Sequence, residues 1–146
     1  MIFITLEDLQ PYIKNNVLAD IIQTPYTIIV ASGSTLLDSI EGISISKIKA
    51  YTGHYYDIDS QLTDIGINRD ALLISLIIDL MLYEMDARLT PTQIPEIRTK
   101  RYNAVIKSLE DIRAGMTPTS WRILQKDVEE SSAYRFGSAP PFTMYY

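Results

Sequence analysis

The chain has 146 residues, of which 47% are hydrophobic and 21% charged, with a net charge of −5 and no cysteine. This length fits one domain with a buried core, and the lack of cysteine excludes disulfides and thiolate metal sites. The acidic balance argues against a general nucleic-acid binder, because such proteins neutralise phosphates with lysine and arginine.

The N-terminal segment carries a helix start. Thr5 is a capping hydroxyl, and Glu7 and Asp8 follow in the first turn, where the helix dipole favours acids. The early acids also argue against a signal peptide. The longest apolar run, residues 71–83, is shorter than the ~20 residues that cross a bilayer, so we expect a soluble protein.

The next segments are a short helical piece at 17–22 and an uncertain stretch at 24–34, which fits either a short strand or an extended linker. From Ser34 the spacing predicts an amphipathic helix that ends near Gly53. Its inner face is formed by Leu37, Ile40, Ser44, Ile48, Tyr51 and Tyr55.

Residues 54–70 have the composition of turns, and we predict a loop. Asn68 or Asp70 can cap the following helix, over residues 69–88. That helix is apolar on nearly all sides, which predicts that it is the buried centre of the domain.

A final helix is predicted to open at Pro95 and to end at Gly115. Beyond it no periodicity is sustained. The fold expected is therefore all-α: a small helical bundle around a buried central helix, formed by residues 1–116, with an extended C-terminal arm at 117–146.

Few residues suggest chemistry. There is no phosphate-binding loop or dinucleotide fingerprint, and His54 is the only histidine, so we expect no catalytic residue, metal or cofactor. Asp79 interrupts the apolar helix, and a carboxylate there is costly unless it is paired. Arg98, Arg101, Arg69 and Arg88 are candidate partners. We predict a structural ion pair of Asp79 with Arg101, in preference to a catalytic role.

Two further clusters have a binding interpretation and a structural one. Residues 98–102 (RTKRY) are basic and offer Tyr102 for base stacking, but that tyrosine falls on the apolar side, so a solvated helix face is favoured. Residues 51–57 (YTGHYYD) are aromatic and are interpreted as core and rim rather than as a sugar or base platform.

The C-terminal arm is unusually aromatic for a segment that has glycine and proline to break its structure. Free tails are normally polar, so we predict that this arm packs against another subunit. The predicted interface residues are Tyr134, Arg135, Phe136, Phe142, Tyr145 and Tyr146.

The order of motifs along the chain resembles a protein family. It runs ITLEDL, IKAYTGHYYDID, INRDALLISLIIDLMLYEMDARLTP and IPEIRTKRYNAVIKSLEDIRAGMTP. These segments are similar to the "YL..RYD", "DI.LY.L" and "RY..A..WL..I..G" motifs of the phage-Mu-like head–tail connector (neck) proteins. The arm's RFGS looks like the form carried by phages of Bacteroides-type hosts. Departures are His54-Tyr55 in place of Arg-Tyr and Ser108 in place of tryptophan.

The resemblance implies a non-enzymatic structural protein of the virion: an adaptor that forms a ring, commonly dodecameric, between portal and tail. Its partners would be copies of itself, the portal and the next neck or tail protein, with DNA passing nearby without specific binding. It would lie in the virion neck, after assembly in the host cytoplasm. A head-closure or tail-completion protein is the alternative, and a small enzyme or host-directed effector using Asp79 is a third hypothesis.

Overall fold

The computed structural model describes residues 3–13, 36–89 and 94–124. This part of the chain is all-α, as predicted, and contains no strand, only an isolated antiparallel bridge between Tyr56 and Ile123. Its elements are α1 (Leu6–Leu9), α3 (Leu36–Thr52), α4 (Ile58–Gln61), the 3-10 turn η2 (Gly66–Asn68), α5 (Ala71–Leu89) and α6 (Glu96–Arg113).

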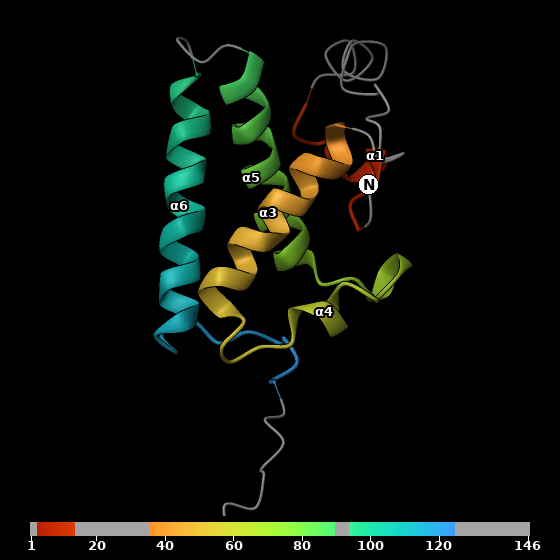
Figure 1. Ribbon diagram of the computed structural model, residues 1–146, viewed down its shortest axis with the longest axis vertical. Helices are drawn as coiled ribbons and strands as arrows, with labels where there is room; N and C mark the ends of the chain where they lie inside the picture. The colour runs from red at the N-terminus through yellow and green to blue at the C-terminus, as the bar shows by residue number, and fades with distance from the viewer. Residues whose placement is uncertain (1–2, 14–35, 90–93, 125–146) are drawn as a thin grey trace, which may run out of the picture.

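The core lies between α3, α5 and α6, each of which contacts the other two. In Figure 1, α5 and α6 run side by side and α3 crosses them obliquely, with α1 beside the N-terminal end of α3. The central position of α5 confirms the prediction from its all-round apolar sequence. Its buried residues are Leu73, Leu76, Ile77, Ile78, Leu80, Met81, Leu82 and Met85.

The flanking helices bury one stripe each. In α6 the stripe is Val105, Leu109 and Ile112, spaced by about one helical turn. In α3 the buried apolar residues are Leu37, Ile40, Ile45 and Ile48. Each fully buried side chain of this size stabilises the fold by about 1.5–3 kcal/mol, so the stripes hold α3 and α6 onto α5.

The helix ends follow local chemistry. Thr5 and Asp8 form a reciprocal capping box at α1. Asp70 caps α5 by accepting from the Leu73 amide at 2.8 Å. At the end of α6 Gly115 has φ +73°, and the Met116 amide returns to the Asp111 carbonyl at 2.9 Å. This is the left-handed glycine termination expected at Gly115.

The structure differs from the predictions in three places. Tyr55, expected on the inner face of the helix that ends near Gly53, lies beyond the end of α3 and is exposed to solvent. Residues 54–70 are not a plain loop but contain α4, whose Asp57 cap accepts from the Ser60 amide, and η2. The body does not stop at residue 116, because Trp121 is 3% exposed and belongs to the core. The predicted helical piece at 17–22 and the stretch at 24–34 lie outside the described residues.

Candidate protein-binding surfaces

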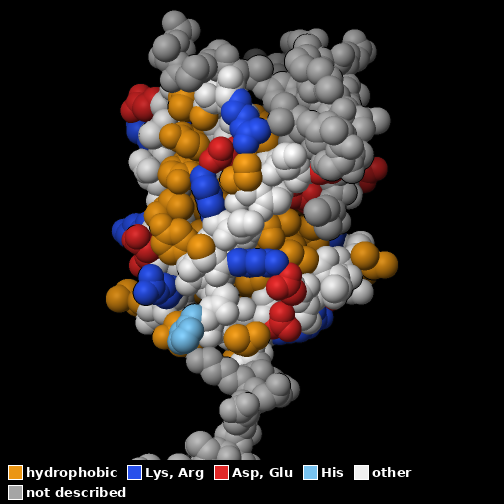
Figure 2. Space-filling view, viewed as in Figure 1, with side chains coloured by type: hydrophobic (Ala, Val, Ile, Leu, Met, Phe, Trp, Pro, Cys, Tyr) orange, Lys and Arg blue, Asp and Glu red, His pale blue; other side chains and the backbone are white. Residues whose placement is uncertain are grey.

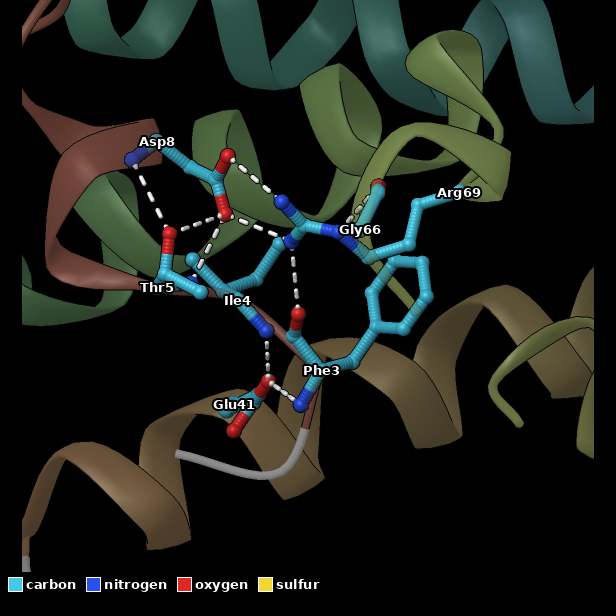
Figure 3. A network of polar contacts seen from close by, with 7 residues as sticks. All are labelled: Phe3, Ile4, Thr5, Asp8, Glu41, Gly66 and Arg69. Carbon is cyan, nitrogen blue, oxygen red and sulfur yellow. Dashed lines mark hydrogen bonds and ion pairs between the residues drawn. The ribbon is translucent and has the colours of Figure 1, made fainter. Parts of the chain in front are cut away.

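A polar framework joins the N-terminal segment to the loop before α5 (Figure 3). Arg69 donates to both carboxylate oxygens of Asp8, at 2.6 and 3.0 Å, and to the Phe3 carbonyl at 2.9 Å. Burial alone would raise the pKa of Asp8, but the hydrogen bonds from Arg69 and Thr5 outweigh it and lower that pKa. The ion pair of Asp8 and Arg69 therefore holds the N-terminal segment against the loop before α5.

Glu41 is the second anchor of this framework, and sequence reasoning missed it. Its side chain is fully buried in α3, and its Oε1 accepts from the backbone amides of Phe3 and Ile4, each at 2.7 Å (Figure 3). A signal was available, because Glu41 stands four residues from Leu37 and from Ile45, on the buried stripe. Its role is to satisfy N-terminal amides that would otherwise be orphaned.

The loop around η2 presents apolar side chains to solvent. Ile65 is 80% exposed and Ile67 is fully exposed. Figure 2 shows a hydrophobic group projecting at the edge of the molecule where Figure 1 places η2. Gly66 between them has φ +61°, a backbone conformation that favours glycine. We call residues 65–67 the isoleucine loop.

The isoleucine loop is braced on both sides by arginine–carboxylate pairs. On its N-terminal side Arg122 donates to both oxygens of Asp64, at 2.9 and 3.1 Å, and to the Ser60 carbonyl. On its C-terminal side Arg69 binds Asp8 and also donates to the Gly66 carbonyl at 3.2 Å. The exposed isoleucines are thus carried by a fixed element.

An apolar pocket of about 350 Å³ lies at the C-terminal end of α6. It is lined by Tyr55, Tyr56, Ile112, Arg113, Ala114, Gly115 and Ile123. Its lining includes side chains that are themselves exposed, Tyr55 at 51% and Ile123 at 74%. A Cβ placed on Gly115 would meet nothing within 4 Å, so the space above that glycine is open. We call this feature the α6-end pocket.

Residues 116–124 form a strap that completes the pocket. Trp121 packs edge-on against Tyr56, with ring centroids 5.7 Å apart, and its Nε1 donates to Asp70 Oδ1 at 3.1 Å. Ser120 donates to the other oxygen of Asp70 at 2.8 Å. Burial alone would raise the pKa of Asp70, but these donors and the Leu73 amide lower it. The strap is therefore anchored to the start of α5.

The expected ion pair of Asp79 is present: Arg101 Nη1 lies 3.2 Å from Asp79 Oδ1. The Asp79 side chain is 14% exposed and that of Arg101 44%, so the pair lies at the rim of the core rather than inside it. Arg98 pairs instead with Asp86 at 3.2 Å. Burial raises the pKa of Asp86 and Arg98 offsets only part of that rise. These contacts link α5 to α6.

Lys47 joins α3 to the same face. It forms an ion pair with Glu84 and lies 5.1 Å from the centre of the Tyr102 ring. Burial alone would lower the pKa of Lys47, but Glu84 and Tyr102 raise it. Tyr102 is stacked on Tyr83 at 4.2 Å, as fits its predicted place on the inner side of the helix.

No group of metal-ligating side chains is found among the residues that the structure describes. His54 is exposed, and its ring lies edge-on to that of Tyr55, with the ring centroids 4.8 Å apart. Within the same residues, no helix is long and apolar enough to span a membrane. Tyr134, Arg135, Phe136, Phe142, Tyr145 and Tyr146 lie outside the described residues, so their predicted interface role stays a prediction.

Comparisons of the chain with protein-family models, with curated proteins and with solved structures find no match.

Proposed function

We propose that the chain is a structural protein of a phage particle: a head–tail connector that forms a ring in the neck between portal and tail. The observation that carries this proposal is the isoleucine loop, in which two exposed apolar side chains are held by ion-paired braces. Neighbouring apolar side chains that stay exposed favour a protein–protein contact, because covering them removes their apolar surface from water. The sequence motifs and the aromatic composition of the C-terminal arm also support a protein that binds other subunits.

The proposed function is non-enzymatic. The carboxylates that stand out in the sequence have structural partners: Asp79 is paired with Arg101, Asp86 with Arg98, and Asp8 with Arg69. Asp70 is engaged by the strap and by the α5 amides. Groups committed in this way hold elements together, which suits a subunit whose task is to keep its shape within an assembly.

The test is co-expression with the portal protein of the same phage genome, followed by size measurement and electron microscopy of the complex. We expect ring-shaped particles with the chain bound to the portal. Truncation after Glu130 removes the aromatic part of the arm, residues 131–146. We expect the truncated chain to keep the helical circular-dichroism spectrum while losing portal binding or ring formation. Binding to a tail protein but not to the portal would favour the head-closure or tail-completion alternative.

A second variant tests the contribution of the isoleucine loop to assembly independently of the arm. Ile65→Glu with Ile67→Glu changes two exposed side chains, so folding should be unaffected while assembly is weakened. Ile97→Glu alters another exposed isoleucine, 58% accessible on α6, and serves as the control. If the full-length chain and all these variants remained monomeric and failed to bind portal or tail proteins, the connector proposal would be wrong.

A further inference from the structure

We infer that two copies of the chain join head to tail, with the isoleucine loop of one copy seated in the α6-end pocket of the next. This inference rests on the proposed function, since it names the contact by which the subunits of such a ring would meet. The partner surface is a second copy of this chain, and both halves of the contact consist of described residues.

The two features are placed for a contact that repeats. In Figure 1 the η2 segment lies on one flank of the body, and the C-terminal end of α6 lies on the other. A contact between two different surfaces of identical subunits is heterologous, so each copy can offer its loop to one neighbour and its pocket to another. Such contacts close into a ring when the rotation between copies closes.

Size and chemistry of the two surfaces agree. The pocket volume of about 350 Å³ is at the lower end of the range of about 300–1,000 Å³ that accommodates drug-sized ligands. Two isoleucine side chains are smaller than such a ligand. The pocket offers the tyrosines at 55 and 56, Ile112 and Ile123 as apolar lining, and apolar groups transferred from water into that lining favour binding.

The charges beside the two surfaces are complementary. Arg113 lines the α6-end pocket. The hollow beside the isoleucine loop is lined by Glu7, Asp64 and Arg69. Asp64 is neutralised by Arg122, and Arg69 is paired with Asp8, so Glu7 is the acidic side chain that complements Arg113. Opposite charges at the rim of a contact guide encounter and disfavour the reverse orientation, in which loop would meet loop. This complementarity is the reason for assigning the pocket to a second copy rather than to an apolar ligand.

The absence of cysteine from the chain makes disulfide cross-linking a clean test. Ile67→Cys and Ile123→Cys are prepared as single variants, mixed, and oxidised at a concentration at which light scattering shows association. We expect dimers from the mixture and not from either variant alone. The double variant should give a ladder of higher oligomers, because each copy then links to two neighbours. Ile67→Cys mixed with Ile97→Cys is the control and should not cross-link.

A second measurement uses the rim charges. Arg113→Glu is expected to weaken self-association about tenfold or more, and Glu7→Arg in the same chain is expected to restore part of it. Neither change touches a core residue, and circular dichroism and thermal melting check the fold of each variant.

The outcomes distinguish a failure of the loop–pocket contact from a failure of the connector proposal. Association and portal binding without a 67–123 cross-link would overturn this contact and leave the connector proposal standing. Dimers of Ile67→Cys alone would also overturn it, since they report a loop-to-loop contact. Loss of association on removal of residues 125–146, with no 67–123 cross-link in the full chain, would assign the pocket to the arm. A chain that never associates, even with portal present, would overturn both.

Discussion

Asp8 and Arg69 lie 61 residues apart in the sequence and face each other as a bidentate ion pair, at 2.6 and 3.0 Å. The Arg69 side chain is 14% exposed and that of Asp8 16%. Because two parallel N–H···O bonds fix the relative orientation of two planar groups, this pair sets the position of the N-terminal segment against the loop that precedes α5.

Removing the arginine from this pair should destabilise the fold. We expect Arg69→Met to lower the free energy of unfolding by about 2 kcal/mol, because a largely buried carboxylate loses its cationic partner. Urea denaturation measures the change. Lys100→Met is the control: its ion pair with Glu96 is 69% and 80% exposed, so the loss should stay within about 0.5 kcal/mol. Equal losses would contradict the structural role of Arg69.

Acid should unfold the protein partly through Asp8 and Asp70. Each has a pKa lowered by folding, so each contributes stability that is fully present above its unfolded value of about 3.9 and is lost as the pH falls through the lower folded pKa. The free energy of unfolding should fall below roughly pH 5. Asp86 acts with the opposite sign, since its pKa is raised, and it offsets part of the loss.

The measurement is urea denaturation at a series of pH values between neutral and acid. Asp8→Asn removes one of the contributing groups, so its curve should be lower at neutral pH and flatter through the acid range. Asp59→Asn is a suitable control, because the Asp59 side chain is 79% exposed. If the free energy of unfolding of Asp8→Asn fell with decreasing pH as steeply as that of the parent, groups other than Asp8 would be responsible for the acid sensitivity.

Glu41 should be needed as an acceptor. We expect Glu41→Ala to cost about 2–4 kcal/mol, since two buried amides, those of Phe3 and Ile4, lose the oxygen that accepts from them. Glu41→Gln keeps an acceptor oxygen and should cost less. Hydrogen exchange checks the mechanism directly: both amides should exchange faster in the alanine variant. Slow exchange that persisted in Glu41→Ala would disprove it.

Much of the bundle could be predicted from sequence because its signals are local. The apolar run of α5, the Asp70 cap and the helix-terminating Gly115 are all readable within one segment. The burial of Glu41 is readable from its spacing, but its partners could not be predicted in this way, because they are amides 37 and 38 residues away. Trp121 falls in a stretch without periodicity, and the groups that it contacts, Tyr56 and Asp70, are distant in the sequence. An ion pair of Asp79 was predictable because a carboxylate in an apolar helix requires a partner. The choice between the candidate arginines was not, since Arg98 pairs with Asp86 and Arg101 with Asp79.

The strap should contribute to the core and not only to the surface. Trp121→Ala is expected to cost about 3–5 kcal/mol, the usual effect of deleting a large buried aromatic side chain. Trp121→Phe keeps most of the packing and loses the bond to Asp70, so it should cost less. Thermal melting is measured in the chain truncated after residue 124, so that the effect of each Trp121 variant is compared with the same shortened parent. If Trp121→Ala were as stable as the parent, the packed body would end at residue 116, as the sequence predicted.

Asp79→Ala should lower the free energy of unfolding by less than the loss of an ion pair inside the core would. Its partner Arg101 is 44% exposed, so the cost is expected to be about 1 kcal/mol or less. A double-mutant cycle with Arg101→Ala isolates the pairwise energy. A loss of several kcal/mol, or one that Arg101→Ala does not share, would show that Asp79 has a further role.

The bracing of the isoleucine loop has a thermodynamic consequence. A segment that must be ordered on binding gives up conformational entropy, about 1–2 kcal/mol for each backbone residue that becomes fixed. The pairs of Arg122 with Asp64 and of Arg69 with Asp8 hold this loop before any partner arrives. Most of the free energy gained by covering Ile65 and Ile67 is then available for affinity. A small contact of this kind can hold, especially when repeated around a closed assembly.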